Sequence, residues 1–302
     1  MKFKQVTARA ALGLMMALVL PLSAISPLPT ESAATVAEAV STKRVTVAAA
    51  ASTGSAAVTA NRYGVTVDGV PMTTDPMLTV MNGVTYASLR SVASVLTPGA
   101  NVSWNGASAT VYKEGVLSLT ATPGLDYISV NGRYLPTAQV IAKNGAVLVS
   151  LDTIVKATDA ACAKQADGTL SLTRGSGGIL PAEQFYNSDD LYWLSRIIYA
   201  ESGNQPLAGK IAVGNVVLNR VRSPRFPNTI YGVIFQRNQF SPASNGTIKR
   251  TPNTESVIAA KLCLDGAVEL SNALYFNRVG LKSWASRNRT FVATIAQHSF
   301  YA

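Results

Sequence analysis

The chain has 302 residues, of which 48% are hydrophobic and 14% are charged, and its formal net charge is +10. This composition excludes a fully disordered chain, which would have fewer apolar residues and more charge, and the length suffices for about two domains. The positive balance favours polyanionic partners, among them nucleic acid, acidic membranes and anionic wall polymers.

The first 39 residues have the layout of a secretory signal peptide. A basic start is followed by an apolar stretch over residues 10–25 and by an Ala-x-Ala pattern at Ala37–Ala39. The apolar stretch is shorter than the roughly 20 residues of a membrane-spanning helix, and Pro21 interrupts it. We therefore expect residues 1–39 to be removed on export and the mature protein to be secreted. An uncleaved membrane anchor is the alternative.

Residues 40–61 are rich in Ala, Ser, Thr and Val and read as a flexible linker. From residue 62 to 174, short alternating runs are separated by Asp-Gly, Asn-Gly and Pro-Gly pairs, which is typical of strands joined by tight turns. This region repeats itself with a period of about 62 residues, since Ser88-Leu89-Arg90 returns as Ser150-Leu151-Asp152. The sequence predicts two copies of a β-rich unit with a small helix, and no carboxylate pair marks a catalytic site there.

Two cysteines and one histidine are too few for a disulfide scaffold or a zinc hydrolase. Cys162 and Cys263 lie in different predicted domains, and a bridge between them is left open. We expect neither a metal ion nor a cofactor.

After a second linker over residues 175–188, the hydrophobic period becomes helical. The pattern predicts a helix that is capped by Ser188 or Asp189 and ends at about Glu201. Glu201 lies on the same face as the apolar Leu194, in the last turn. Burial and the negative end of the helix dipole both raise the pKa of a carboxyl group there, so that it can donate a proton near neutral pH.

The remaining pattern predicts a small, mainly helical α+β domain over residues 189–302. A second helix is predicted over Pro206–Val221 and a third over Glu255–Asp265. Two strands are predicted to follow, at Ala273–Asn277 and Phe291–Tyr301.

A second catalytic carboxylate is not apparent. No Asp or Glu stands between residues 202 and 254, and Asp190 lies ~16 Å from Glu201 along the same predicted helix. Glycosidases with two catalytic carboxylates hold them roughly 5–9.5 Å apart. The sequence therefore favours a mechanism with one glutamate.

Linked motifs are distributed over residues 189–301. They are YAESGNQP at 199–206, VGNVVLNRV at 213–221, FPNTIYGVI at 226–234, QFSP at 239–242, ALYF at 273–276 and QHSFY at 297–301. In this order and spacing they resemble the SleB-type cell wall hydrolases, the spore cortex-lytic family. One departure is Gln205, which stands where the family usually has a second acidic residue.

The resemblance implies a lysozyme-like catalytic domain with Glu201 as its acid. It implies a lytic transglycosylase that cuts the bond between N-acetylmuramic acid and N-acetylglucosamine in peptidoglycan or spore cortex. Two alternatives remain: a simple muramidase or glucosaminidase that uses water, and a non-catalytic wall-binding protein. Anionic wall polymers are expected as further partners and the cell wall or spore envelope as the location. Nucleic acid is not expected, and the need for an accessory wall or spore protein is left open.

Further residues in these motifs are predicted to contact the substrate or to orient Glu201. Polar side chains can bind sugar hydroxyl groups, one of two adjacent aromatic rings can stack on a sugar, and the single histidine is more often structural than catalytic. The candidates are Tyr199, Asn219, Gln239, Phe240, Ser241, Tyr275, Phe276 and His298.

Residues 62–174 resemble the stalk module named after the N-terminal domain of copper amine oxidases. The resemblance rests on VDG at 67–69, NG at 82–83, SLR at 88–90 and VSW at 102–104, and the second copy is divergent. The region has no histidine to bind copper. The resemblance implies a spacer or a surface-binding role.

Overall fold

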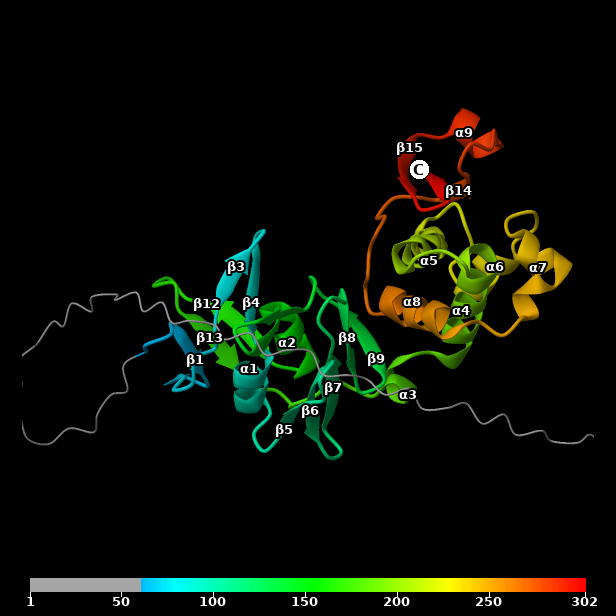
Figure 1. Cartoon of the computed structure of the whole chain (residues 1–302). Coiled ribbons are helices and arrows are strands. Elements are labelled where there is room, and N and C mark those ends of the chain that lie inside the picture. Colours follow the sequence, from blue (N-terminus) through cyan, green and yellow to red (C-terminus); the bar gives the residue numbers. More distant parts are fainter. Residues whose placement is uncertain (1–60) are drawn as a thin grey trace, which may run out of the picture. The chain divides into compact units, whose positions relative to one another are not determined.

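The computed structural model describes residues 61–302, which form helices and sheets of the α+β class (Figure 1). The predicted signal peptide and all but the last residue of the predicted first linker lie outside the described residues. Within the described range, no helix has the length and apolar character needed to traverse a bilayer.

The β-rich part, residues 65–173, contains two four-stranded sheets, one five-stranded sheet and two short helices. The strands are β1 (Val65–Val67), β2 (Val70–Pro71), β3 (Thr79–Met81), β4 (Val84–Ser88), β5 (Asn101–Trp104), β6 (Ala109–Lys113), β7 (Leu117–Ala121), β8 (Tyr127–Val130), β9 (Arg133–Pro136), β10 (Ile141–Lys143), β11 (Ala146–Ser150), β12 (Ala161–Lys164) and β13 (Leu170–Thr173). The helices are α1 (Leu89–Leu96) and α2 (Leu151–Ala157). The strand orders are β12-β13-β1-β2, β10-β11-β4-β3 and β5-β6-β7-β8-β9.

The two copies of the sequence repeat fold alike and interlock. In each copy a hairpin leads into a short helix, β3–β4 into α1 and β10–β11 into α2. Each hairpin turns on an Asn-Gly pair with positive φ, Asn82-Gly83 and Asn144-Gly145, as the tight turn requires. Strands β4 and β11 of the two copies then pair with each other, and β1 of the first copy pairs in parallel with β13 of the second. Neither copy therefore completes its sheets alone.

The helical part, residues 182–301, combines helices with one three-stranded sheet, of order β14-β16-β15. The helices are α3 (Ala182–Phe185), α4 (Ser188–Ser202), α5 (Leu207–Arg222), α6 (Ile230–Phe235), α7 (Ser241–Asn245), the short 3₁₀ helix η1 (Thr247–Lys249), α8 (Thr254–Leu264) and α9 (Trp284–Asn288). The strands are β14 (Tyr275–Arg278), β15 (Phe291–Ile295) and β16 (His298–Tyr301).

The sequence-based boundaries need correction at three places. Asn187, not Ser188 or Asp189, caps α4, because its side chain accepts the first free N–H groups of the helix. Asn253 caps α8 in the same way, so this helix begins at Thr254, one residue before the expected Glu255. The single strand expected over Phe291–Tyr301 is a hairpin, since the chain turns at Ala296, where φ is +49°.

Helices α4, α5 and α8 pack together around the core of the helical part. Gly214 lies where α5 meets both neighbours: a Cβ atom there would come within 2.6 Å of the Cys263 Sγ and 3.0 Å of the Ile198 Cδ1. The glycine is therefore needed for close helix packing. Cys263 is buried and Cys162 is exposed, and both are free thiols.

A buried ion pair links the β-rich part to the helical part. Arg133 on β9 donates to both carboxylate oxygens of Asp265, at the end of α8, with 3.4 Å from Nε to Oδ2. The side chains of Arg133 and Asp265 are only 6% and 0% exposed. Tyr186 also donates to this carboxylate, and Phe185 covers the guanidinium at 3.3 Å from its ring centroid. The Asp265 charge is thus satisfied by partners from two separate segments.

Truncation of Arg133 should leave the Asp265 carboxylate buried without its countercharge. We expect Arg133→Ala to lower the free energy of unfolding by about 3–5 kcal/mol, as is typical when one partner of a buried pair is removed. Arg174→Ala, which breaks the half-exposed pair with Asp68, is the matched control and should have a much smaller effect. Guanidinium denaturation measures both, and equal losses would contradict a structural role for the buried pair.

Candidate active site

A cavity of about 580 Å³ opens in the helical part, beside the C-terminal end of α4. Aromatic side chains form much of its wall, and arginine, asparagine, glutamine and serine side chains supply polar groups. The candidate residues that line it are Glu201, Gln239, Phe240, Ser241, Tyr275, Phe276 and His298. Tertiary folding thus brings together residues that are up to 97 positions apart in the sequence, from Glu201 to His298.

Two candidates do not line this cavity. The amide of Asn219 is buried and donates to the carbonyl oxygens of Leu270 and Ala273, at 3.0 and 3.1 Å. Asn219 therefore fixes the segment that leads into β14. Tyr199 lies two residues before Glu201 on α4, and its carbonyl accepts the N–H of Gly203 at 2.9 Å. Its contact is with the turn after α4 rather than with the cavity.

The half-buried carboxyl group of Glu201 lines the cavity from the last turn of α4. The helix places it there because Leu194, Ile197 and Ile198 on the same helix are fully buried in the core. Burial raises the pKa of Glu201 to about 7, and the positive charge of Arg220 opposes part of that rise. A carboxyl group with such a pKa is protonated in a substantial fraction of molecules at neutral pH and can act as an acid.

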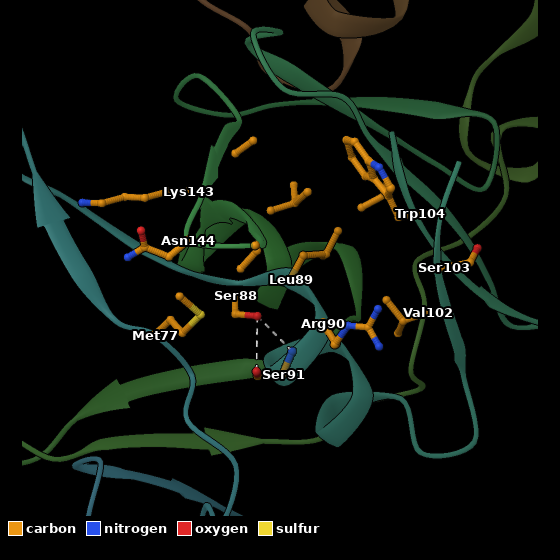
Figure 2. A pocket seen from close by; sticks show the side chains of 15 residues that line it. Met77, Ser88, Leu89, Arg90, Ser91, Val102, Ser103, Trp104, Lys143 and Asn144 are labelled. Atoms are coloured by element: carbon orange, nitrogen blue, oxygen red, sulfur yellow. Dashed lines mark hydrogen bonds between the residues drawn. The ribbon is translucent and has the colours of Figure 1, made fainter. Parts of the chain in front are cut away.

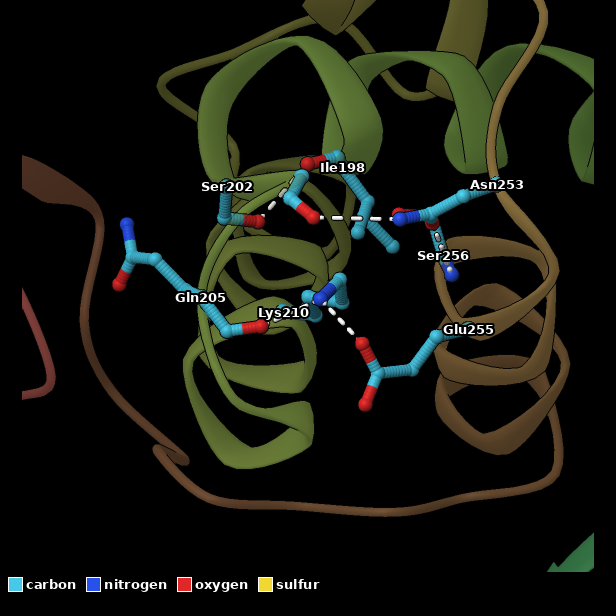
Figure 3. A network of polar contacts seen from close by, with 8 residues as sticks. Ile198, Ser202, Gln205, Lys210, Asn253, Glu255 and Ser256 are labelled. Atoms are coloured by element: carbon cyan, nitrogen blue, oxygen red, sulfur yellow. Dashed lines mark hydrogen bonds and ion pairs between the residues drawn. The ribbon is translucent and has the colours of Figure 1, made fainter.

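The turn that ends α4 is held in place by hydrogen bonds from several elements (Figure 3). Ser202 donates from its hydroxyl to the carbonyl of Ile198 at 2.7 Å, and Asn253 donates to the carbonyl of Gly203 at 3.2 Å. At Gly203 a Cβ atom would lie only 2.6 Å from the Tyr199 carbonyl oxygen, so the tight turn requires glycine. These contacts fix the chain immediately after the catalytic candidate.

A fully buried lysine on α5 stabilises the same turn through a backbone carbonyl. Lys210 on α5 is 1% exposed, and its ammonium group donates to the carbonyl of Gln205 and to Glu255 of α8, at 2.5 Å from Oε2 (Figure 3). A buried ammonium group is costly unless it is paired. The arrangement therefore ties the Gln205 backbone to α5 and α8.

The sequence does not assign Arg220 to the site, because the end of α5 can face either the cavity or solvent. The structure buries it against the aromatic wall, with its guanidinium 5.0 Å from the Phe226 and Phe240 ring centroids and 5.5 Å from that of Tyr275. Its Nε donates to the Leu274 carbonyl at 2.7 Å, whereas one terminal nitrogen has no partner among the described residues. Burial lowers the pKa of Arg220 to about 10, so it remains charged at neutral pH.

Glu201 is the only Asp or Glu among the described residues that line the cavity. The nearby acids on α8 have other partners: Glu255 pairs with Lys210, and Asp265 pairs with Arg133. This geometry agrees with the single-carboxylate pattern expected from the sequence. It leaves any second catalytic group to come from the substrate or from solvent.

An exposed tryptophan extends the aromatic wall at the mouth of the cavity. Trp284 is 54% exposed, and its ring meets that of Tyr275 edge to face at 5.7 Å. Arg289 lies over both rings, 5.2 Å from the Tyr275 centroid and 4.6 Å from the Trp284 centroid. An exposed aromatic face fixed by neighbours in this way suits stacking on a sugar ring.

The single histidine is held by the glutamine that departs from the family pattern. Gln205 places its amide 3.0 Å from Nδ1 of His298 and accepts the Gln297 N–H through its side-chain oxygen at 3.2 Å. Burial lowers the pKa of His298, which favours the neutral ring. In the tautomer that accepts from Gln205 at Nδ1, the proton stands on Nε2, so His298 is a donor rather than a base.

A protonatable carboxyl group among aromatic and amide side chains is the type of site with which enzymes cleave glycosidic bonds. Residues 204–301, about a third of the chain, match the family model described as Cell Wall Hydrolase. The C-terminal part of this chain therefore contains a domain of that family. The match begins three residues after Glu201, so the case for Glu201 rests on the geometry above.

The curated relatives are spore cortex-lytic enzymes. The one from Bacillus cereus is 38% identical over 91 residues, which cover 30% of this chain and 35% of that protein. The one from Oceanobacillus iheyensis is 33% identical over 118 residues, which cover 39% and 43%. The matched parts thus span less than half the length of either relative.

Among solved structures, the catalytic domain of the germination-specific lytic transglycosylase SleB from Bacillus anthracis is similar to this chain. Its sequence is 33% identical, the match covers 41% of this chain and 100% of that domain, and the TM-score is 0.37.

Replacement of Glu201 should remove the acid and leave the fold intact. Glu201→Gln keeps the shape of the side chain but cannot release a proton, so turnover on purified peptidoglycan should fall by a factor on the order of 10²–10⁴. Because the acid acts in its protonated form and its pKa is about 7, wild-type kcat/KM should fall as the pH rises above about 7. Glu183→Gln, at an exposed position, should leave both rate and pH profile unchanged. Near-normal turnover of Glu201→Gln would remove Glu201 from the mechanism.

The contact between Gln205 and His298 can be tested directly, because the untagged chain has one histidine. Gln205→Glu places a carboxylate beside Nδ1, which stabilises the charged ring, so we expect the pKa of His298 to rise from below its ordinary value of 6.5 to above it. An NMR titration of the single imidazole measures this shift. Gln184→Glu at an exposed position is the control. A His298 pKa that stays low in Gln205→Glu would show that the two side chains do not interact in solution.

Proposed function

We propose that this protein is a peptidoglycan lytic transglycosylase that cleaves the bond between N-acetylmuramic acid and N-acetylglucosamine. The observation that carries the proposal is a single carboxyl group, Glu201, with its pKa raised to about 7, in a cavity of about 580 Å³ with no second Asp or Glu in the described lining. The cell wall hydrolase domain and the spore cortex-lytic relatives support a glycan of the wall or the cortex as the substrate.

In the first step Glu201 donates its proton to the oxygen of the scissile glycosidic bond. The bond between this oxygen and C1 of the muramic residue breaks, N-acetylglucosamine leaves as an alcohol, and positive charge develops at C1. Glu201 is now a carboxylate, which the nearby charge of Arg220 stabilises. The desolvation that raises the pKa of Glu201 thus keeps the acid protonated before the reaction, and the charge of Arg220 limits the cost of the carboxylate that proton transfer leaves behind.

In the second step the substrate itself supplies the nucleophile. The C6 hydroxyl of the muramic residue attacks C1 and gives its proton to the Glu201 carboxylate, which restores the acid and closes a 1,6-anhydro ring. This step needs neither water nor a second carboxylate. The described lining of the cavity, with Glu201 as its one Asp or Glu, agrees with such a step. The acetamido group of the substrate and the surrounding dipoles stabilise the charge at C1 between the two steps.

The other side chains of the cavity hold the glycan in place. Gln239 and Ser241 offer hydrogen bonds to sugar hydroxyl and N-acetyl groups, and Tyr275 and Trp284 offer a stacking surface at the mouth. Phe276 packs against Phe300 and His298 and contributes mainly to the wall.

The rest of the chain suits delivery to an extracellular substrate. Residues 1–39 act as an export signal and residues 40–61 as a linker. Residues 62–174 act as a stalk-like module that is followed by a linker over 175–188 and the catalytic domain over 189–302. The mature enzyme works in the cell wall or the spore envelope.

The products distinguish the proposed reaction from its alternatives. We expect mass spectrometry of digested peptidoglycan to find muropeptides that end in 1,6-anhydro-muramic acid, and Glu201→Gln to give none. Reducing muramic or glucosamine ends in their place would show a hydrolase that uses water. An absence of any release by the wild-type protein from wall and cortex alike would favour a non-catalytic wall-binding protein.

A further inference from the structure

The β-rich part contains a larger cavity of its own, of about 660 Å³, a volume usual for small-ligand sites. Its walls come from the junction of β4 and α1, from the edge strand β5 and from the hairpin β10–β11 (Figure 2). It shares no lining residue with the cavity around Glu201. The two edge strands β5 and β10 leave this side of their sheets open.

Two cations line this cavity without acidic neighbours. Arg90 and Lys143 are exposed, and no Asp or Glu belongs to the described lining. Within residues 61–302, neither side chain makes an ion pair or a hydrogen bond, whereas Arg133 and Arg174 both pair with carboxylates. The cavity is therefore an uncompensated positive site, which favours a negatively charged ligand.

An exposed indole completes the site. Trp104 is the last residue of β5 and is 49% exposed, and Figure 2 shows it on the opposite side of the cavity from Lys143 and Asn144. Apolar side chains such as Leu89 and Val102 line the space between them. A half-exposed indole in a concave site offers a flat face for a ring, and the amide of Asn144 offers polar contacts.

The fold of the repeat does not require these side chains. In the second copy, Asp152 stands at the position of Arg90, directly after the matching Ser-Leu pair. The strand that corresponds to β5 is β12, whose sequence ACAK contains no aromatic residue. The hairpin, the helix and the closing strands form in both copies. The cationic and aromatic residues of the first copy are thus additions to a scaffold that folds without them.

We propose that this cavity binds an anionic saccharide. One sugar ring stacks on Trp104, and its carboxylate or phosphate group lies between Arg90 and Lys143. A nucleic-acid strand would need a longer track of cations and aromatic rings than two cations and one indole. The choice of a wall glycan as the source rests on the proposed function. The enzyme would then bind insoluble peptidoglycan at a second site, separate from the catalytic cavity.

The test measures binding rather than cleavage, so that its outcome does not depend on the catalytic proposal. The parent is the full mature chain with Glu201→Gln, sedimented with purified insoluble peptidoglycan. Addition of Trp104→Ala should weaken binding by about tenfold, and addition of Arg90→Glu with Lys143→Glu by about tenfold or more with loss of the salt dependence. Matched controls are Tyr112→Ala, an equally exposed aromatic residue, and Lys164→Glu, an exposed lysine outside the cavity. Both should bind like the parent.

Chemical treatment of the peptidoglycan shows whether the ligand's negative charge is a phosphate or a carboxylate. Hydrofluoric acid removes phosphodiester-linked polymers, and carbodiimide coupling with an amine neutralises carboxylates. Loss of the Trp104-dependent binding after one treatment identifies that group as the ligand. Unchanged binding after both treatments, cavity variants that bind like the controls, or displacement by single-stranded DNA but not by glycan fragments would each overturn the inference. If only the cavity variants lose binding while the wild-type chain proves inactive, this site stands and the catalytic proposal fails.

Discussion

Desolvation of one carboxyl group at the end of α4 is the constraint on which the helical part depends. The apolar stripe of α4 must face the core, and the last turn of that stripe carries Glu201 into the cavity. A charged carboxylate there would be costly, so the group holds its proton to about pH 7. The cost is tolerable because the carboxyl group still faces an open cavity and lies near the positive charge of Arg220.

The surrounding structure keeps this position from relaxing. If the turn after α4 could move outward, Glu201 would regain water and its pKa would fall. Asn253 and Lys210 hold the turn through its backbone carbonyls, and Gln205 ties it to the β15–β16 hairpin beside His298. The Lys210 contact also satisfies the carbonyl of Gln205 in a buried position, where an unpaired polar group would be costly. The same contacts therefore stabilise the fold and preserve the acidity of the site.

The two parts of the chain each contain a cavity, and the two cavities differ in chemistry. The cavity around Glu201 combines an acid with a wall of aromatic rings, whereas the cavity of the β-rich part combines free cations with one indole. The buried pair between Arg133 and Asp265 joins the two parts of the chain. Each charge needs the other as its partner, because a buried charge without a countercharge is costly. Local sequence gave no sign of this pair, since its partners lie 132 residues apart.

Short-range patterns in the sequence predict the local elements and single out Glu201 as the candidate acid. Periodicity and capping residues predicted α4, α5 and α8 to within a few residues, and the Asn-Gly turns predicted the hairpins, because these signals act over a few positions of the chain. Helix packing places Arg220 near Glu201, whereas the adjacent Asn219 turns away to the carbonyls of Leu270 and Ala273. Neighbouring positions of a helix point about 100° apart, and which of them meets the cavity depends on how α5 packs against β14, a contact between distant segments that no local pattern encodes.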